Sequence, residues 1–341
     1  MKLVRVHGPG RYGIDDIPLP NPGPRDVVVR VAACGICGSD IHYVRWGRTR
    51  ENGDPMPLGH EAAGIVETVG AEVAGITPGM RVFINPVAGG GEVIGNGGAE
   101  GAFSDRVLVR DVIAGETLLP VPGTISLAQA ALVEPLAVGL HGVNRGKPTS
   151  ETRAAVFGCG PIGLGAVMWL ARRGVRHVVA VDISDARLDY AKQMGAHATI
   201  NPFREDLAAR LTELHGEGIA VMGQPTVGTD VFYDMAGGKD VIANIIGIAQ
   251  YHARLVISAV YPEPVEVSFL DALMRELEIT TAGGYPDELA PVLAELPAIP
   301  PAILDAYVSH SFPFEQFDEA FAIAQRPDSA KVMVTFDQGE N

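Results

Sequence analysis

Three residues in the first part of the chain carry side chains that bind metal ions. Cys37 offers a thiolate, His60 an imidazole and Glu61 a carboxylate, and this set of donors suits zinc. They stand in the segments CGICGSDIHY and GHEAAG, so only the tertiary structure can bring them together. From the residue types alone, a zinc site and a buried cysteine beside a core histidine are equally open.

Cys34 and Cys37 also form a CxxC pair, a spacing found in redox proteins. In those proteins the pair opens a helix after a strand, whereas Gly38 and Ser39 here favour a loop, so the redox interpretation is the weaker one. The third cysteine, Cys159, makes the number of cysteines odd and low. We therefore expect no disulfide framework and a cytoplasmic protein.

A glycine-rich segment in the middle of the chain predicts a dinucleotide site. Residues 154–174 read AAVFGCGPIGLGAVMWLARRG, an apolar strand, a GxGxxG turn and an apolar helix. The first glycine permits the tight turn, the second leaves room for a pyrophosphate, and the third lets the helix pack on the strand. The helix N-terminus supplies free N–H groups for an anion. The residues expected to contact the cofactor here are Gly158, Gly160, Pro161, Ile162 and Gly163.

Asp182 is the second element of this predicted cofactor site. It ends the β-branched run 177–181, about 20 residues after the last glycine, where a carboxylate that binds the adenosine ribose belongs. A 2′-phosphate would bring like charge against Asp182, so we predict NAD rather than NADP. Arg187 is the one cation close by in sequence that could neutralise such a phosphate.

Composition and pattern indicate which elements position these residues. The 341 residues suggest two domains, and the net charge of -15 argues against nucleic acid or an anionic membrane as partner. The start MKLVRVHGPG has no apolar signal core, so we expect no secretion. Up to about residue 119 the sequence alternates in short runs broken by Gly and Pro, which predicts a barrel-like β domain.

Strands and helices alternate in the second part, which predicts a doubly wound parallel α/β sheet. A helix with a break near Pro135 leads into it. A Pro-rich loop, a helix at 317–324 and a strand at 331–336 are expected in the tail. The six strands of the sheet are expected near 154–157, 177–181, 198–200, 230–233, 254–259 and 278–282. We place the domains at 1–137 with 285–341 returning to it, and at 138–284.

Four segments carry a resemblance to a known family. GICGSDIHY, GHEAAG, LVEPLAVGLH and VFGCGPIGLGAV occur in this order, and the whole chain resembles the zinc-dependent medium-chain alcohol and polyol dehydrogenases, especially the sorbitol, L-idonate, butanediol and threonine dehydrogenase branch. The resemblance implies a GroES-like catalytic domain and a six-stranded Rossmann domain. It further implies NAD-dependent oxidation of a secondary alcohol, such as a polyol, sugar acid or diol, by a homodimer or homotetramer.

The resemblance also implies roles for single residues. Ser39 and His42 match a proton relay, Tyr285 matches a substrate contact, and Arg187 matches a residue that supports the ribose. Apart from the resemblance, Tyr43 and Trp46 are candidates for the wall of the substrate pocket. Asp40 matches the carboxylate that holds the ligand imidazole. Whether Glu61 or Glu134 is the further ligand stays open. The residues matching the metal site are Cys37, His60, Glu61 and Glu134.

One segment departs from the family. Many relatives carry a lobe in which four cysteines hold a structural zinc, but residues 85–101 contain no cysteine and are fewer, so we expect one catalytic zinc ion per subunit and no structural zinc. The basic cluster of Arg45, Arg48 and Arg50 has two interpretations, a solvated loop or a site for a substrate carboxylate.

Two rival functions remain to be weighed. A zinc-free quinone or enoyl reductase on the same fold lacks the set of Cys37, His60 and Glu134, which this chain has. A nucleotide-binding redox sensor without enzymatic activity has no use for Ser39 and His42. The sequence therefore favours the zinc enzyme.

Overall fold

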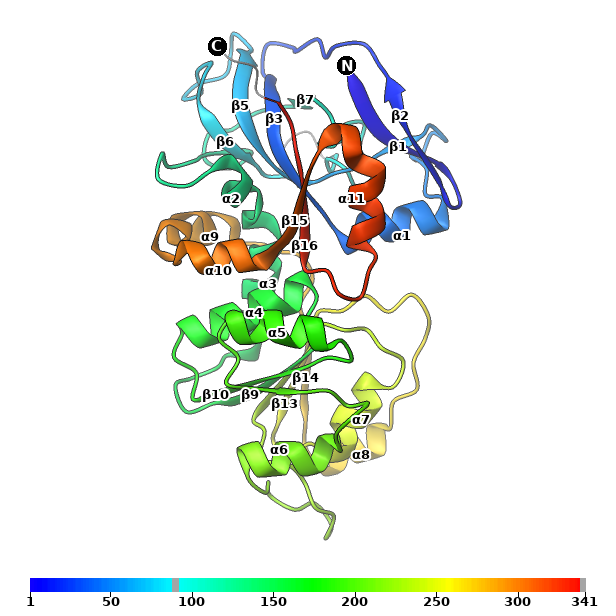
Figure 1. Ribbon diagram of the computed structural model, residues 1–341, viewed down its shortest axis with the longest axis vertical. Helices are drawn as coiled ribbons and strands as arrows, with labels where there is room; N and C mark the ends of the chain where they lie inside the picture. The colour runs from blue at the N-terminus through cyan, green and yellow to red at the C-terminus, as the bar shows by residue number, and fades with distance from the viewer. Residues whose placement is uncertain (88–91, 338–341) are drawn as a thin grey trace.

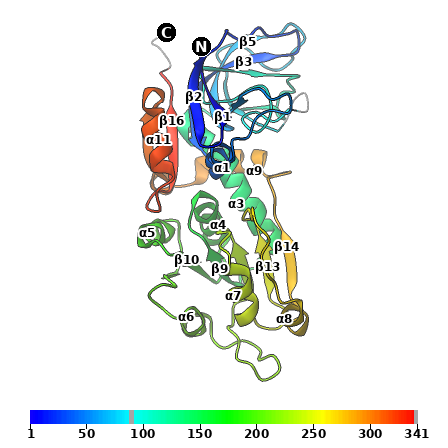
Figure 2. The ribbon, with the colours of Figure 1, turned by 90° about the vertical axis from the view of Figure 1, so that its right-hand side faces the viewer.

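The computed structural model describes residues 1–87 and 92–337. Two sheets follow one another along the long axis of the molecule, and helix α3 (Val133–Gly146) runs between them (Figures 1 and 2). The upper sheet contains strands from both ends of the chain, and the lower one contains strands from its middle. The predicted combination of a β-rich part with a doubly wound α/β part is confirmed.

The upper part holds the strands that carry the predicted metal ligands. Within the described residues, a seven-stranded sheet has the order β15-β16-β3-β5-β6-β8, with β7 paired to β3, and a smaller sheet has the order β2-β1-β4. β16 lies antiparallel to β3, and β3 lies antiparallel to β5. The strands are β1 (Lys2–Gly8), β2 (Arg11–Asp16), β3 (Val27–Ile36), β4 (Met56–Pro57), β5 (Glu61–Val69), β6 (Arg81–Ile84), β7 (Arg106–Val109), β8 (Leu118–Pro120), β15 (Val308–Pro313) and β16 (Lys331–Thr335).

The lower sheet is parallel throughout and has the order β11-β10-β9-β12-β13-β14 in the described chain. Chain order reverses between β9 and β12, the switch point at which open α/β sheets bind ligands. Its strands are β9 (Arg153–Phe157), β10 (His177–Val181), β11 (Ala198–Ile200), β12 (Val231–Asp234), β13 (Arg254–Ile257) and β14 (Glu278–Thr281).

Alternation along β9 explains why this sheet is covered on both faces. Ala154 and Val156 pack into the apolar core that contains α3 and α4, whereas Ala155 and Phe157 pack into a second core with α6 and α7. Successive side chains of a strand point to opposite faces, so a central strand covered on both sides must be apolar throughout.

Among the described helices, none is long and apolar enough to cross a membrane. The helices around this sheet are α4 (Pro161–Arg172), α5 (Asp185–Gln193), α6 (Leu207–His215), α7 (Val241–Ile248) and α8 (Phe269–Met274).

Of two local predictions, one was wrong and one is confirmed. Residues after Cys37 form helix α1 (Gly38–Trp46), not a loop. Asp40, in the first turn, helps to cap the helix instead, because its carboxylate accepts the Cys37 N–H at 2.9 Å. The predicted break near Pro135 is confirmed: the connecting helix is interrupted at Leu132, between α2 (Leu127–Ala131) and α3. Pro135 itself sits in the first turn of α3, where proline is tolerated.

The tail holds more structure than predicted. The expected Pro-rich loop contains helices α9 (Leu289–Glu295) and α10 (Pro301–Tyr307), the short 3-10 helix η1 (Leu296–Ala298) and strand β15. Pro301 begins α10, and Pro297 is the second residue of η1; prolines are tolerated there because the first N–H groups of a helix are unpaired in any case. The predicted last helix and strand are confirmed. They are α11 (Phe317–Ala324), preceded by η2 (Phe314–Gln316), and β16.

Candidate active site

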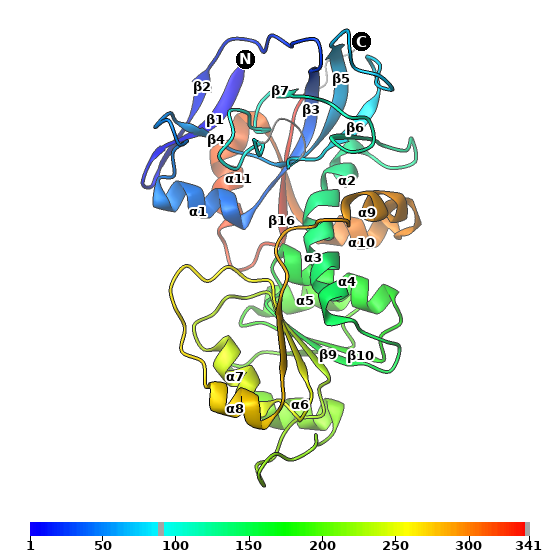
Figure 3. The same ribbon diagram turned by 180° about the vertical axis from the view of Figure 1, so that it is seen from behind.

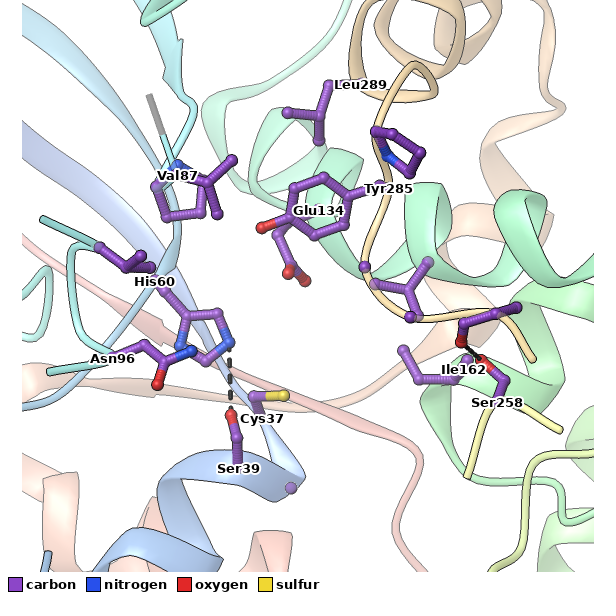
Figure 4. A pocket seen from close by; sticks show the side chains of 18 of the residues that line it. Cys37, Ser39, His60, Val87, Asn96, Glu134, Ile162, Ser258, Tyr285 and Leu289 are labelled. Atoms are coloured by element: carbon purple, nitrogen blue, oxygen red, sulfur yellow. Dashed lines mark hydrogen bonds between the residues drawn. The ribbon is translucent and has the colours of Figure 1, made fainter. Parts of the chain in front are cut away.

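A cavity of about 1080 Å³ opens between the two parts of the molecule. Its described walls come from α1, the start of β5, the first turn of α3, the start of α4 and the loops after β13 and β14. Figure 4 shows Cys37 and His60 on one side and Glu134 and Tyr285 across from them. The cavity also reaches Ile162, beside the glycine-rich turn, so it can hold a cofactor and a second molecule together.

The three predicted metal ligands from the first domain lie together. Cys37 is the residue before α1, and His60 and Glu61 stand at the start of β5. One donor atom from each lies within 4.8 Å of the other two, and among the described residues this is the cluster that could hold a metal ion. Glu134 is not a member of it.

The surroundings of His60 fit a cation at this point. Ser39 Oγ lies 3.5 Å from its Nε2, and an Asp40 carboxylate oxygen lies 3.7 Å from its Nδ1, which has no hydrogen-bond partner among the described residues. Burial alone would lower the pKa of His60, but the Asp40 carboxylate and the Cys37 sulfur raise it well above its usual value. A ring surrounded by anions needs a positive partner, and the sulfur, nitrogen and oxygen donors match zinc.

The Asp40 carboxylate is held by two backbone hydrogen bonds. It is fully buried, and its two carboxylate oxygens accept the N–H groups of Cys37 at 2.9 Å and Gly59 at 3.2 Å. Burial raises its pKa, and the nearby His60 opposes that rise. These backbone bonds fix both segments that carry the donor atoms.

Glu61 has a partner that the sequence did not reveal. Lys331 Nζ lies 2.7 Å from both carboxylate oxygens of Glu61, and it also donates to Ile36 O at 3.0 Å. Glu61 is 0% and Lys331 is 1% exposed. The one available signal was a lysine at the start of an otherwise apolar strand, because a buried charge requires a partner.

Glu134 lies in the first turn of α3 and lines the cavity. Burial raises its pKa to about 7, while His60 and the nearby Tyr285 hydroxyl oppose the rise. Burial and the same carboxylate raise the pKa of Tyr285. The two side chains therefore form a wall opposite the sulfur and imidazole donors.

The glycine-rich turn has the geometry that a phosphate site needs. Gly158 has a φ of 90°, and its N–H donates to Val181 O at 2.8 Å. A side chain at Gly163 would overlap the Gly158 carbonyl, whereas one at Gly160 would meet nothing within 4 Å. Two glycines are therefore required by packing, and the third faces open space at the N-terminus of α4.

Asp182 follows β10 and is buried, with one carboxylate oxygen accepting the Cys159 N–H at 2.6 Å and the other the Ser184 N–H at 2.8 Å. These bonds fix its direction. Arg187 instead donates to the backbone of the tail, with Nε 3.2 Å from Ser329 O. The structure thus brings Asp182 to the turn and ties Arg187 to the segment before β16.

The outer wall of the cavity comes from α1 and the shortened lobe. The Tyr43 hydroxyl donates to Asn96 Oδ1, and Arg48 stacks over the Tyr43 ring at 4.9 Å from its centroid. His42 stacks on Trp46, and burial and then Arg45 lower its pKa. Asn96 had no distinguishing signal in the sequence. Part of the lobe, residues 88–91, lies outside the described residues.

Comparisons with known proteins agree over the whole chain. The alcohol dehydrogenase GroES-like domain matches residues 23–122, and the zinc-binding dehydrogenase family matches residues 161–297. Sorbitol dehydrogenase from Gallus gallus is 33% identical over 357 residues, which cover 98% of this chain and 96% of that protein.

Solved structures show the same likeness. 2R,3R-butanediol dehydrogenase from Bacillus subtilis has a TM-score of 0.85 at 28% identity and covers 98% of this chain and 99% of its own. A protein described as a short-chain alcohol dehydrogenase from E. coli CFT073, solved with NADH, has a TM-score of 0.85 at 26% identity, with coverages of 98% and 99%.

Proposed function

The chain belongs to the family of zinc-binding alcohol dehydrogenases, and on that premise we propose that it oxidises a secondary alcohol with NAD at a single catalytic zinc ion. The observation that carries the proposal is the convergence of Cys37, His60 and Glu61 donor atoms within 4.8 Å, beside a cavity that extends to the nucleotide turn. When bound, zinc and NAD supply the Lewis acid and the hydride acceptor.

The residues around the donors take distinct tasks in this proposal. Cys37, His60 and Glu61 hold the metal ion, and Asp40 keeps the His60 ring in place. Ser39, 3.5 Å from His60 Nε2, receives the proton of the alcohol, and His42 passes it to solvent. The lowered pKa of His42 suits an acceptor that must be neutral.

Glu134 and Tyr285 act on the substrate side of the cavity. With a pKa raised to about 7, Glu134 is able to exchange a proton with a bound hydroxyl near neutral pH. Glu134 and Tyr285 lie together on one side of the cavity (Figure 4). We propose that they orient the alcohol opposite the metal ion, with Tyr43 forming the outer wall.

We propose that the cofactor is NAD. The Asp182 carboxylate, fixed by two backbone N–H groups, accepts the ribose hydroxyls, and Gly158, Gly160 and Gly163 shape the turn for the pyrophosphate. Pro161 and Ile162 open the helix that faces it. Arg187 donates to the tail backbone through Nε, and we propose that it supports the ribose corner beside Asp182.

The substrate class follows from the family and the cavity. The relatives include enzymes of sorbitol and of 2R,3R-butanediol, and the described lining combines His, Tyr, Asn and Glu side chains with apolar ones. Such a lining binds hydroxyl groups on a short carbon chain. We propose a polyol, sugar acid or diol as substrate, in a cytoplasmic protein whose three cysteines are unpaired.

We further propose a homodimer or homotetramer with the two domains placed at 1–137 plus 285–341 and at 138–284. Strand β14 is at the edge of the lower sheet, and α8 lies at the lower end of this part of the molecule (Figure 3). Helix α8 exposes apolar side chains. Phe269 is 76% and Leu270 and Leu273 are each 68% exposed. An open edge beside an apolar patch is suited to contact with a second copy.

The testing experiment is NADH formation from a panel of polyols, diols, aldonates and threonine, followed by absorbance. We expect turnover of at least one secondary alcohol, its loss after chelation and its recovery with added zinc. Elemental analysis should give about one zinc per subunit, since three cysteines leave no four-cysteine site. Turnover that survives complete metal removal would point to the zinc-free reductase alternative.

A further inference from the structure

The Lys331 ammonium is enclosed inside the candidate metal site. Its three hydrogen bonds, two to the Glu61 carboxylate oxygens at 2.7 Å and one to Ile36 O at 3.0 Å, match the three donors that an ammonium has. Taking two charges out of water is costly. The buried ion pair of Lys331 and Glu61 therefore has a cost in stability, and we relate it to the role of Glu61 at the metal site.

The register of three strands produces this contact. β3 runs between β5 and β16, with Gly35 opposite Glu61 on one side and Met333 on the other. A side chain at Gly35 would overlap the Glu61 carboxylate and lie 3.3 Å from Lys331 Cδ. The missing side chain lets Lys331 reach across β3, so a residue near the end of the chain enters a site built from its beginning.

Both oxygens of Glu61 are bound by the same ammonium. Each carboxylate oxygen has two lone pairs, so either oxygen can still meet a metal ion, but it then shares its charge with Lys331. A thiolate from Cys37 and a full carboxylate would cancel the two charges of zinc. Lys331 leaves the centre one charge more positive, which strengthens its attraction for an alcohol oxygen.

We propose that Lys331 is a positioning residue that shares the Glu61 carboxylate with the catalytic metal ion and weakens Glu61 as a ligand. This rests on the proposed zinc-dependent function. If Lys331 loses its charge, Glu61 is released to the metal ion, so the metal ion is held more tightly while the site becomes less electrophilic. A purely structural ion pair would leave metal release unchanged and affect only folding.

The test measures release of zinc to a chromogenic chelator and the visible absorption of the cobalt-substituted protein. Lys331→Met and Lys331→Gln remove the charge, and the second keeps an amide donor so that the fold is retained. We expect both to slow metal release about tenfold, or about 1.4 kcal/mol in the barrier, and to shift the cobalt bands. Lys331→Arg keeps the charge and should behave like the wild type.

Two controls separate this role from folding. In a Glu61→Gln background, Lys331→Gln should no longer change metal release, because the coupling requires the carboxylate. Arg275→Met removes a buried cation that contacts backbone carbonyls elsewhere, and it should lower stability without altering the cobalt spectrum.

The outcomes separate the role of Lys331 from the proposed zinc-dependent function. Normal zinc uptake with unchanged or faster release in Lys331→Gln would overturn the role of Lys331 and leave the proposed function standing. An effect that persists in the Glu61→Gln background would also overturn it. A wild-type protein that takes up no zinc would overturn the proposed function and this inference with it.

Discussion

Two groups of buried and half-buried polar residues lie in different parts of the molecule. The cleft cluster consists of Cys37, His60 and Glu134, which line the cavity, and of the buried pair of Glu61 and Lys331 behind them. The histidine cluster consists of Arg153, His177, His215, Thr229 and Asp230, at the start of strands β9 and β10 and around the end of α6.

The histidine cluster matches donors with acceptors. His215 Nδ1 lies 2.7 Å from Thr229 Oγ1, and its Nε2 lies 3.1 Å from His177 Nδ1. Arg153 pairs with both carboxylate oxygens of Asp230 at 3.1 and 2.8 Å. Polar groups satisfied in this way stabilise one fold and leave nothing for a ligand.

In the cleft cluster, by contrast, His60 Nδ1 has no hydrogen-bond partner among the described residues, and an Asp40 carboxylate oxygen lies 3.7 Å from it. The pKa values of His60 and His215 differ accordingly. The pKa of His60 is raised by its anionic neighbours against the effect of burial, whereas burial, with His177 and Arg153, lowers the pKa of His215 to about 4. Burial of titratable groups alone therefore does not mark a functional site, but an unbalanced charge that faces a cavity does.

The largest expected effect comes from removing the sulfur donor. Cys37→Ala should abolish zinc binding and lower kcat/KM by more than about a hundredfold, the upper range for loss of an outer-shell partner. Cys34→Ala is the matched control, because this cysteine is buried in β3 and is not part of the cavity lining. Metal analysis and NADH formation measure both variants, and equal zinc contents would contradict the assignment of Cys37.

Most of the fold could be predicted because its signals are local. The apolar strands, the glycine turn and the Asp182 position follow from patterns within about 30 residues, the length of one βαβ unit. The helices α9 and α10 were missed because prolines, which begin helices as well as loops, were interpreted as breaks.

The candidate site could be predicted only in part. The sequence offers Cys37, His60 and Glu61, but the contact of Glu61 with Lys331 joins residues 270 positions apart. It depends on the register of β16 against β3, which no local pattern encodes. The grouping of Glu61 rather than Glu134 with the sulfur likewise depends on the direction of side chains.

The next effect concerns the cofactor end of the cleft. We expect the wild type to prefer NAD over NADP by at least about tenfold in kcat/KM, or about 1.4 kcal/mol. Asp182→Ala should narrow that preference, chiefly by weakening NAD binding. Asp185→Ala is the control. Asp185 is the first residue of α5, close to Asp182 in the sequence, and its carboxylate pairs with Arg204. A wild type that favours NADP would contradict the role of Asp182.

A smaller effect is expected for the proposed proton relay. His42→Ala should slow alcohol oxidation by about tenfold or less, and mainly at low pH, where solvent base is scarce. Added buffer base should partly restore the rate. Because Arg45 contributes to lowering the pKa of His42, Arg45→Gln should move the acidic limb of the wild-type profile to higher pH. Identical pH profiles for His42→Ala and the wild type would remove His42 from the relay.

Changes in the histidine cluster are expected to leave activity at neutral pH unchanged. They should instead alter the free energy of unfolding and its dependence on pH. His215 has a folded pKa of about 4 against about 6.5 in an unfolded chain. Between these values the unfolded state binds the additional proton, so the free energy of unfolding falls as the pH falls from about 6.5 to 4, by up to about 1.4 kcal/mol per unit from this residue.

His215→Gln tests this because glutamine keeps a hydrogen-bonding side chain beside Thr229 and carries no titrating group. The variant should lose about 1 kcal/mol at neutral pH through imperfect hydrogen bonds and should show a shallower loss of stability below pH 6.5. His252→Gln, at an exposed pair with Glu276, is the control. Urea unfolding at several pH values gives the slopes. If the free energy of unfolding of His215→Gln depended on pH as in the wild type, His215 would not be the group that titrates. If the variant lost much of its turnover at neutral pH, the histidine cluster would take part in the chemistry as well as in stability.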